Sequence, residues 1–486
     1  MITDFPITKG KSFTDVEAAL DYIDHLYQES CARIKTAFQG ILDGVLDENL
    51  AIDATYPFIG LRVEAKDLHL DARLSYGVVL EPGFYGTTVT RPDIFRNYYR
   101  EQISLLLDHH KVPIVIGASL VTIPLPYVVD HTPAQLDTEQ LWHVRNGFVL
   151  PNLSRLDDSI PNGTLHPKED ELKPLALFSA ERVDFSLHRL QHYTGTSPEH
   201  FQGFVLLTNY QRYIDEFIAY SKEQLAEDNS YTHLVAPGNI SINKNHDAKK
   251  SDLPLKHLPQ MPAYHLKRKD NQGITFINIG VGPSNAKTIT DHLAVLRPHC
   301  WLMLGHCAGL RSTQMLGDYV LAHAYVREDH VLDQDLPPWI PLPPIAEVQV
   351  ALQQAVANVS HEKGAELKAR MRTGTLVTSD NRNWELRTHE LYERFKQSRA
   401  IALDMESATV AANGFRFRVP YGTLLCVSDK PIHGEIKLQG MANAFYRQRV
   451  NQHLKIGLEA VRILREEGVE QLHSRKLRGF DEPPFR

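Results

Sequence analysis

Two carboxylates and a methionine stand close together in the stretch LDMESATVAA, residues 403–412, where an apolar run gives way to small residues. The helix dipole favours an acid in a first helical turn by about 0.3 to 1 kcal/mol, and this alone would account for Glu406. A carboxylate can also accept two hydrogen bonds at once, which matches a vicinal diol, and Met405 offers a soft apolar wall. The pair therefore predicts a clamp for the two hydroxyls of a ribose, with Asp404 in a structural role.

A third acid, Asp429, ends the apolar run in GTLLCVSDKP, residues 422–431. Partial burial at the rim of a sheet can raise the pKa of such a carboxyl enough to make it a general acid, with Lys430 or Lys437 assisting the proton. The alternative is that Asp429 caps the turn before Pro431, and local sequence alone favours this second interpretation.

The stretch INIGVGPSNAKT, residues 277–288, has the pattern of a strand, a glycine turn and a helix start. Glycine lets the backbone approach a ligand, and a helix N-terminus presents N–H groups to an anion. Gly282, Ser284 and Asn285 are therefore candidates for binding a substrate. The spacing fits neither GxGxxG nor a Walker loop, so a simple tight turn remains the alternative.

The elements that must position these residues begin at about residue 177, where short apolar strands alternate with helical patterns. That alternation predicts a largely parallel sheet covered by helices on both faces. Ligands bind such sheets at the carboxyl ends of the strands. The polar residues expected at that edge are Thr208 and Asn209, Gly280 to Asn285, Gly305 and His306, Ser379 and Asp380, Asp404 to Glu406, and Ser428 to Lys430.

The N-terminal part follows a different pattern. Helical spacing from Phe13 to about Leu42 predicts one long amphipathic helix, and Arg91-Pro92 opens another. A polar, proline-bearing stretch over residues 152–175 is the candidate linker. We expect an α+β N-terminal domain, residues 1–176, and a catalytic domain, residues 177–486. Alternating residues predict antiparallel strands over 54–65, 68–80 and 84–90.

Composition is that of a soluble globular protein, with 486 residues of which 43% are hydrophobic and 23% charged. The net charge of −7 argues against a partner such as nucleic acid or an anionic membrane and favours a small molecule. The four cysteines form no CxxC pair, which indicates reduced thiols and no zinc site. Because no signal-peptide pattern and no run of about 18 apolar residues occurs, we expect a cytoplasmic protein.

Taken together and in this order, the segments within residues 203–465 resemble the nucleoside phosphorylase superfamily, whose members end core strands in a Met-Glu that holds ribose and a Ser-Asp that protonates a purine. Over nearly its full length the chain looks like the bacterial AMP nucleosidase family. The resemblance implies an α/β fold, with a nucleoside-phosphorylase-like mixed sheet covered by helices and a separate α+β N-terminal domain. The segments that carry it include RVDFSLHRLQHYTGT, GVGPSNAKTI, LDMESATVAA and LHSRKLRGFDEPPFR.

The resemblance also implies roles for residues at matching positions. Met405 and Glu406 match the ribose-binding pair, and Asp429 matches the acid that protonates purine N7. Arg212 occupies the place of the phosphate-binding arginine of a GDPxR motif, which here is TNYQR.

Two positions depart from the phosphorolytic members. His306 and Met303 stand where those members carry a serine and an arginine, and the loss of two phosphate ligands favours water as the nucleophile. Trp384 is the nearest aromatic residue that could stack on the base.

The implied reaction is hydrolysis of AMP to adenine and ribose 5-phosphate, with no cofactor required for the chemistry. The resemblance further implies Mg-ATP as an activator, phosphate as an inhibitor and a homohexamer, with regulation or assembly as candidate roles of the N-terminal domain. A phosphorolytic purine nucleoside phosphorylase and a non-catalytic nucleotide sensor are the alternatives.

Candidates for holding the 5′-phosphate are Arg212, Arg311, the turn at 282–285 and residues 87–92.

Overall fold

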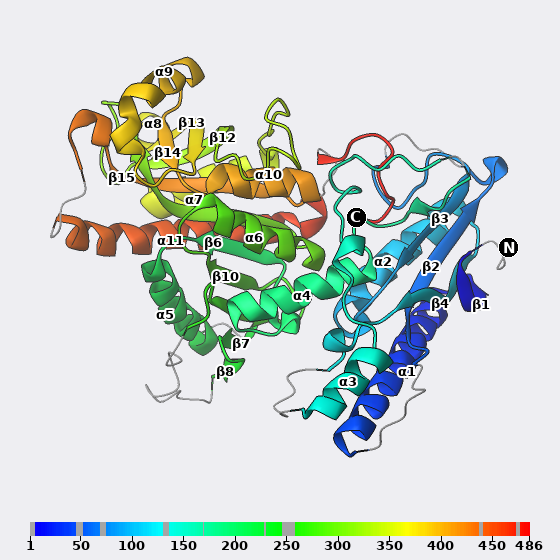
Figure 1. Cartoon of the computed structure of the whole chain (residues 1–486). Helices are drawn as coiled ribbons and strands as arrows, with labels where there is room; N and C mark the ends of the chain where they lie inside the picture. The colour runs from blue at the N-terminus through cyan, green and yellow to red at the C-terminus, as the bar shows by residue number, and fades with distance from the viewer. Residues whose placement is uncertain are drawn as a thin grey trace. The chain divides into compact units, whose positions relative to one another are not determined.

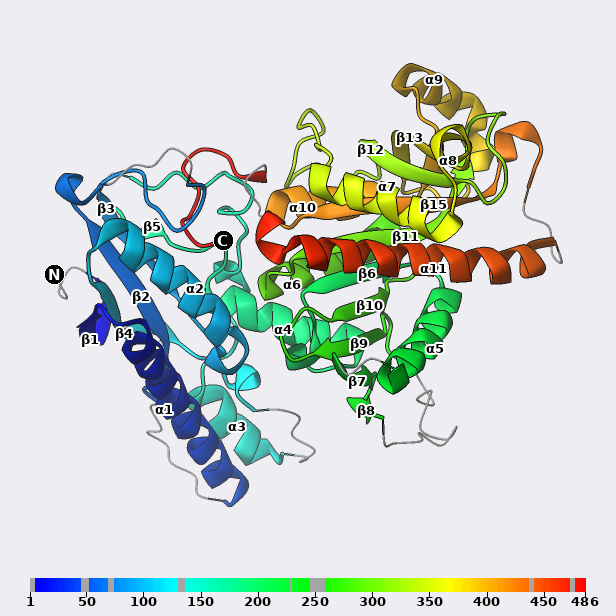
Figure 2. The same ribbon diagram turned by 180° about the vertical axis from the view of Figure 1, so that it is seen from behind.

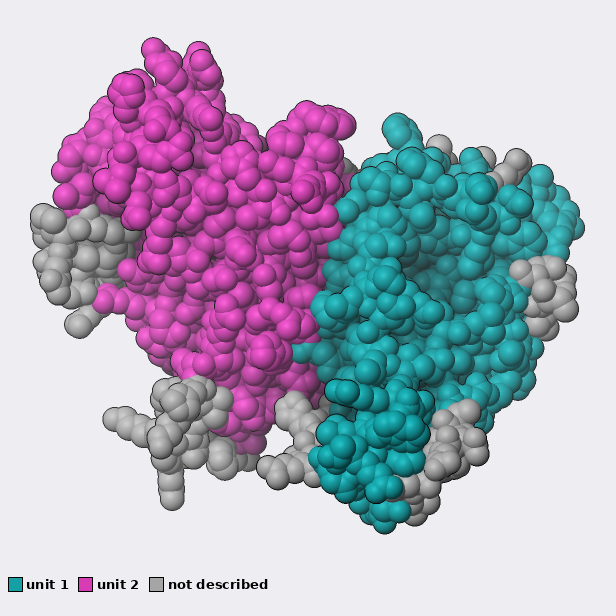
Figure 3. All heavy atoms as spheres, in the orientation of Figure 1, with its two compact units in different colours: residues 1–188, 478–486 teal, residues 189–477 magenta. Residues whose placement is uncertain are grey.

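Figure 1 shows the structure, a computed structural model, coloured along the chain. It describes residues 5–44, 52–68, 74–129, 136–168, 170–227, 230–244, 258–436, 441–472 and 477–486, with the backbone alone for 441–448. The chain forms two compact units, one of residues 1–188 with 478–486 and one of residues 189–477 (Figure 3). The division falls after His188 instead of after residue 176, and the C-terminal residues 478–486 pack with the first unit.

Unit 1 contains a five-stranded sheet in the order β1-β4-β2-β3-β5, antiparallel except for the β3–β5 pair. The alternating segments at 54–65 and 84–90 are confirmed as paired strands. The strand predicted over 68–80 is wrong for residues 74–80, which are irregular, while 69–73 lie outside the described residues. The strands are β1 (Ile7–Phe13), β2 (Thr55–Val63), β3 (Gly83–Thr88), β4 (Ile114–Thr122) and β5 (Lys173–Pro174).

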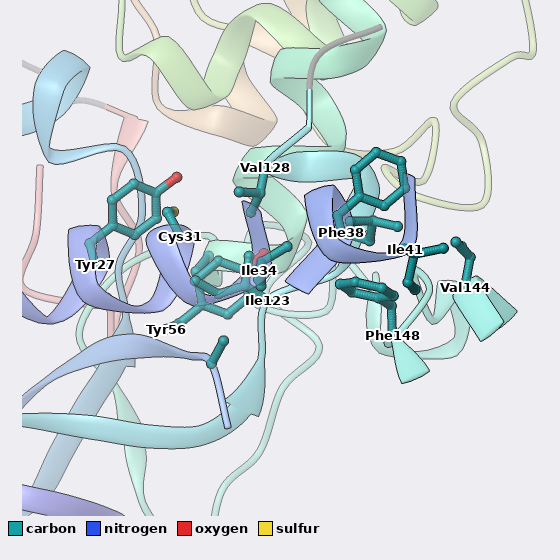
Figure 4. Packing of buried hydrophobic residues seen from close by; sticks show 13 residues of the cluster. Tyr27, Cys31, Ile34, Phe38, Ile41, Tyr56, Ile123, Val128, Val144 and Phe148 are labelled. Atoms are coloured by element: carbon teal, nitrogen blue, oxygen red, sulfur yellow. The ribbon is translucent and has the colours of Figure 1, made fainter. Parts of the chain in front are cut away.

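Helix α1 (Val16–Leu42) packs on this sheet, and the helices α2 (Pro92–His110) and α3 (Thr138–Gly147) pack against α1. Asp15 caps α1 by accepting a hydrogen bond from the Ala18 N–H at 2.8 Å, so the helix begins after Phe13, which ends β1. The predicted helical spacing is confirmed by the buried face of α1. Figure 4 shows how that face meets β2 and the residues around α3, through Tyr27, Ile34, Phe38, Tyr56, Ile123, Val144 and Phe148.

Unit 2 contains a ten-stranded sheet in the order β14-β13-β12-β15-β11-β6-β10-β9-β7-β8. The strands β10, β6, β11 and β15 are mutually parallel, so their carboxyl ends share one edge. The sheet is mixed, which confirms the fold that the resemblance implies, and it is less parallel than the alternation of strands and helices predicts. β9, β7 and β8 form an antiparallel edge, and β12 runs antiparallel to β15. The strands are β6 (Phe204–Thr208), β7 (Tyr231–Ala236), β8 (Ile240–Ile242), β9 (Ala263–Arg268), β10 (Ile274–Asn278), β11 (Cys300–Gly309), β12 (Tyr319–Glu328), β13 (Met371–Ser379), β14 (Ala402–Asp404) and β15 (Tyr421–Asp429).

Strand β14 has a second partner, since it also pairs antiparallel with the end of β11 through Ala308–Leu403 and Gly309–Ala402. This pairing closes β14, β13, β12, β15 and β11 into a ring. It brings the residues that follow β14 to the carboxyl end of β11, where the sequence placed the polar strand ends.

Helices cover the ten-stranded sheet, as the sequence predicted. In Figure 2, α7 and α11 lie side by side along it, and α5 packs against α11 while α10 packs against α6. Helix α7 was not predicted. The helices are α4 (Ala180–Thr194), within which the two units divide, α5 (Gln211–Glu227), α6 (Pro283–Leu293), α7 (Ala346–Ser360), α8 (Gly364–Arg370), α9 (Thr388–Ser398), α10 (Ser407–Phe417) and α11 (Met441–Glu467).

All four cysteines are buried and none forms a disulfide. Within the part of the chain that the structure describes, every helix is too short or too polar to cross a membrane.

Candidate active site

Glu406 lies immediately after β14, at the start of α10, and its side chain is fully buried. The amide of Asn209 donates to Oε2 at 2.9 Å, and the backbone N–H of Gly282 donates to Oε1 at 2.7 Å. These two donors follow β6 and β10, whose carboxyl ends lie side by side in the sheet. One carboxylate therefore joins the ends of three strands.

Two glycines make this arrangement sterically possible. Gly282 has a φ of +118°, a backbone conformation that residues with a side chain rarely adopt, and it directs its N–H at Glu406 just before Pro283 opens α6. At Gly305 on β11, a Cβ atom would lie 3.3 Å from Oδ1 of Asn209. Glycine at both positions therefore leaves room for the donors to reach the carboxylate.

The electrostatics of the site follow from burial. Removal from water and the nearby Asp404 carboxylate both raise the pKa of Glu406, the Gly282 and Asn209 hydrogen bonds oppose them, and the net result is a pKa of about 8. Burial also raises the pKa of Asp404 to about 6. The two acids titrate as a pair, so proton uptake by one depends on the charge of the other.

Asp404 has a different set of partners. Its Oδ1 accepts from the Thr378 hydroxyl at 2.6 Å, and its Oδ2 accepts from the Ser407 N–H at 3.0 Å and from the Ser407 hydroxyl. The Thr378 hydroxyl in turn accepts from the Ala408 N–H at 2.8 Å. Asp404 thus ties β13 to the first turn of α10, which is a structural arrangement.

Asp429 ends β15 at the same edge of the sheet and is half-buried. The Ser428 hydroxyl donates to its Oδ1 at 2.6 Å. The Lys430 ammonium is buried and lies 2.6 Å from Oε1 of Glu435, so it is directed to that carboxylate. Lys437, the other candidate for assisting the proton, lies outside the described residues.

His306 is buried on β11, where the rings of Tyr210 and Tyr213 lie 5.1 Å and 5.6 Å from its own, measured between centroids. Met303 is also buried on this strand. Arg212 lies in the first turn of α5, between the two tyrosines in sequence and half-buried. The three positions that match the phosphate site of phosphorolytic relatives, Met303, His306 and Arg212, thus lie on β11 and at the start of α5.

The remaining predicted residues are spread around the sheet edge. Met405 is half-buried beside Glu406, Ser284 is exposed in the first turn of α6, and Asn285 donates to the Val281 carbonyl oxygen at 3.5 Å. Arg311 donates to the Arg399 carbonyl oxygen at 2.8 Å. The candidate segment 87–92 belongs to unit 1.

Trp384 does not fit the stacking role that the sequence suggested. Its side chain is only 3% exposed, and its ring packs edge-on against Phe395 at 5.9 Å between centroids. It belongs to a hydrophobic cluster with Ala308 and Leu403. A base needs an exposed aromatic face for stacking, so this structure presents Trp384 as a packing residue.

Sequence reasoning did not assign a role to Asn209. It placed this residue among the polar strand ends, but nothing local shows that its amide reaches a carboxylate 197 positions away. Among the described residues, no three His, Cys, Asp or Glu side chains are grouped so that they could hold a metal ion.

Comparison with known proteins agrees with this architecture. A family model described as bacterial AMP nucleoside phosphorylase N-terminus matches residues 18–172, and one described as phosphorylase superfamily matches residues 248–462. The AMP nucleosidase of Escherichia coli K12 is 51% identical, and the alignment covers 98% of this chain and 99% of that protein. The same holds for the AMP nucleosidase of Escherichia coli O157:H7.

Two solved structures are also similar. The AMP nucleosidase of Bacteroides thetaiotaomicron is 27% identical, with 59% of this chain and 98% of that chain covered and a TM-score of 0.43. The purine nucleoside phosphorylase of Toxoplasma gondii is 20% identical, with 57% and 98% covered and a TM-score of 0.41.

The closed mixed sheet with its buried Glu406 and the family match place unit 2 in the phosphorylase superfamily, with the nucleoside phosphorylase fold. Sequence identity over nearly the whole chain narrows this further. The chain belongs to the AMP nucleosidase family and is an enzyme.

Proposed function

We propose that this protein hydrolyses the N-glycosidic bond of AMP and releases adenine and ribose 5-phosphate. The observation that carries the proposal is the buried Glu406 carboxylate, held by Asn209 and Gly282 at the joined ends of three strands. Family membership supports the substrate and the reaction.

Glu406 is the ribose clamp in this proposal. Oε2 accepts from Asn209 and Oε1 accepts from Gly282, and a carboxylate has about four lone-pair sites, so the two oxygens can also take the 2′- and 3′-hydroxyls. Holding the sugar fixes C1′ for attack by water, and the negative charge stabilises the oxocarbenium character that develops as the bond breaks. Met405 contributes the apolar wall beside the sugar.

Asp429 is the acid for the leaving group. Negative charge builds on the purine as the bond breaks, and a proton delivered to N7 neutralises it. Asp429 ends β15, which is parallel to β11, so its carboxyl lies at the ligand-binding edge of the sheet. The Ser428 hydroxyl at 2.6 Å orients that carboxyl.

Water is the nucleophile in this proposal. Met303, which is buried and uncharged, stands where phosphorolytic relatives have a phosphate-binding arginine. His306 stands where they have a serine, and its ring packs against Tyr210 and Tyr213. Arg212, at the start of α5, is the candidate for the 5′-phosphate, together with Gly282, Ser284 and Asn285.

Regulation and assembly belong to the same proposal. We expect activation by Mg-ATP, inhibition by phosphate, a homohexamer and a cytoplasmic location, with unit 1 as the regulatory or assembly domain. These expectations rest on the family resemblance.

The test measures adenine and ribose 5-phosphate released from AMP, with and without phosphate and Mg-ATP, in wild type, Asp429→Asn and Glu406→Gln. We expect phosphate-independent hydrolysis, reduced about 10²- to 10⁴-fold in Asp429→Asn. Asp215→Asn, which changes an exposed carboxylate on α5, is the matched control and retains wild-type rates. Turnover only with phosphate would indicate a phosphorylase, and AMP binding without turnover a sensor.

A further inference from the structure

Among the residues that the structure describes, the buried carboxylate of Glu406 accepts from one side chain, the amide of Asn209, in addition to backbone N–H groups. We propose that Asn209 is a positioning residue for the reaction, and that its amide orients Glu406 to receive the ribose diol and favours its ionised form. The inference rests on the proposed function, because it assigns the role of Asn209 through the ribose clamp.

Geometry provides the first argument. Asn209 directly follows β6, and its Nδ2 lies 2.9 Å from Oε2 of Glu406, while the Gly282 N–H lies 2.7 Å from Oε1. One donor on each oxygen fixes both the position and the plane of the carboxylate. A diol must meet both oxygens at once, so a carboxylate that rotated would lose one of the two substrate hydrogen bonds.

The packing around the amide provides the second argument. With Nδ2 directed at Glu406, Oδ1 points toward β11, where a Cβ on Gly305 would lie 3.3 Å away. That separation is tighter than most Cβ contacts, so a Cβ at this position would require the amide to shift by a few tenths of an ångström. Because Gly305 has no side chain, Nδ2 of Asn209 can stay directed at Glu406.

Charge provides the third argument. The groups that act on Glu406 are the Asp404 carboxylate from β14, the Gly282 N–H from the turn before α6, the Asn209 amide from the turn after β6, and the N–H of Met405. Burial and Asp404 both favour the protonated form of Glu406, and the donors favour the ionised form. An amide adds a donor without adding charge.

The GDPxR pattern of phosphorolytic relatives would place a carboxylate at this position, where this chain has Asn209 in TNYQR. An aspartate there would put a third acid within hydrogen-bonding distance of a buried pair. It would compete with Glu406 for a proton instead of donating one. In this chain, asparagine donates to Glu406 without adding a charge beside Asp404.

The experiment measures kcat/KM for AMP against pH in the full-length enzyme, for wild type, Asn209→Ala and Asn209→Asp. Loss of the donor raises the pKa of Glu406, so the acid limb of the profile moves to higher pH. If the pKa of Glu406 rises by about one unit, kcat/KM at pH values below that pKa falls about tenfold, and it returns to the wild-type value at alkaline pH. Asn209→Asp, which adds a carboxylate, moves the limb at least as far.

Two controls separate this role from a structural one. Gln211→Ala removes a neighbouring amide that donates to Asp215, and it keeps the wild-type pH profile. Asn209→Ser retains a hydroxyl donor and gives a smaller shift than alanine, which keeps the test valid if the alanine variant is unstable. A purely structural residue would lower activity equally at every pH.

The outcomes are distinguishable from failure of the proposed function. If the wild-type protein releases no adenine from AMP, the proposed function fails. If it does and Glu406→Gln retains wild-type turnover, the ribose clamp fails, and the role of Asn209 fails with it. If Glu406→Gln is inactive but Asn209→Ala and Asn209→Ser keep the wild-type acid limb, the role of Asn209 alone is overturned.

Discussion

The hydroxyl of Tyr213 lies 2.7 Å from Nδ1 of His453, and Nε2 of the same imidazole lies 3.0 Å from the carbonyl oxygen of Leu424. A carbonyl oxygen only accepts, so Nε2 carries the ring proton and Nδ1 accepts from Tyr213. The bond joins α5 to α11 in a fully buried position, and the Tyr213 ring also packs against His306. The Leu424 carbonyl therefore sets the tautomer of His453, and Tyr213 links that histidine to the candidate phosphate region through its hydroxyl and its ring.

Tyr213→Phe tests the energy of this bond. The ring still packs against His306, but Nδ1 of His453 loses its donor in a buried place, which costs about 1 to 3 kcal/mol of unfolding free energy. Denaturant unfolding measures the change, and Tyr392→Phe, an exposed tyrosine on α9, is the control. Equal stability of the Tyr213→Phe and wild-type proteins would contradict the assigned hydrogen bond.

His453 makes the protein sensitive to acid. Burial lowers its pKa to about 3, whereas an unfolded histidine titrates near about 6.5. Between these pKa values the unfolded chain binds a proton at His453 that the folded chain does not bind, so the unfolding free energy falls as the pH drops from about 6.5 toward 3. His453→Gln is expected to weaken this dependence, measured as unfolding free energy against pH. His389→Gln, exposed on α9, should keep the wild-type slope.

Asp404→Asn should shift the pH profile of activity in the direction opposite to Asn209→Ala. The Asp404 carboxylate raises the pKa of Glu406, so its neutralisation lowers that pKa and moves the acid limb of kcat/KM to lower pH. Ser407→Ala is the control, because it removes one hydrogen bond from Asp404 and leaves the charge. An acid limb that moves upward in Asp404→Asn would show that the two carboxylates are not coupled in this way.

Asp184 on α4 is expected to make unit 1 less stable as the pH rises. It is buried, it accepts from the Tyr56 and Thr90 hydroxyls at 2.8 Å each, and burial raises its pKa to about 7. An unfolded aspartate titrates near about 3.9, so between about pH 4 and 7 the unfolded chain has released a proton that the folded chain still holds, and stability falls as the pH rises.

Asp184→Asn removes that titration, and its amide can accept from one hydroxyl and donate to the other. Thermal unfolding at pH 5 and pH 8 measures the effect in the full-length chain, with Asp108→Asn, an exposed acid on α2, as the control. The variant should lose less stability between the two pH values than wild type does. A loss as large as that of wild type would assign the pH dependence to another group.

The sequence predicted most of the elements that build the site, because strand and helix periodicity is local. β6, β10 and β15 each end in a polar residue, and parallel pairing brings those ends to one edge. β11 instead continues beyond the expected end at Gly305 and His306 and stops at Gly309. The long-range pairings were not predictable in the same way. The β11–β14 closure and the antiparallel edge of β9, β7 and β8 depend on contacts between strands that no local pattern specifies.

The site shows the same limit at the level of single residues. Glu406 was found because an acid beside a methionine at a strand end is a local signal. Its two donors are 197 and 124 positions away, so only the fold identifies them. The exposure of a side chain is also a property of the fold, and this is why Trp384 was assigned to the base although it is buried.

Trp384→Leu tests whether this residue packs or stacks. Trp384 lies in a cluster with Ala308, Leu403 and Phe395, so a smaller side chain leaves a cavity and lowers the unfolding free energy. Truncation of a buried tryptophan to alanine costs about 3 to 5 kcal/mol, and this is the upper limit for the leucine variant. Leucine still fills part of the space but offers no aromatic face. Because a packing residue does not touch the base, we expect the KM for AMP to stay within about twofold of wild type. Loss of a stacking residue would cost roughly 1 to 3 kcal/mol of binding. Trp339→Leu, which changes a tryptophan that is 81% exposed, should alter neither quantity. A KM that rises about tenfold or more in Trp384→Leu, with unfolding unchanged, would return the residue to the base-binding site.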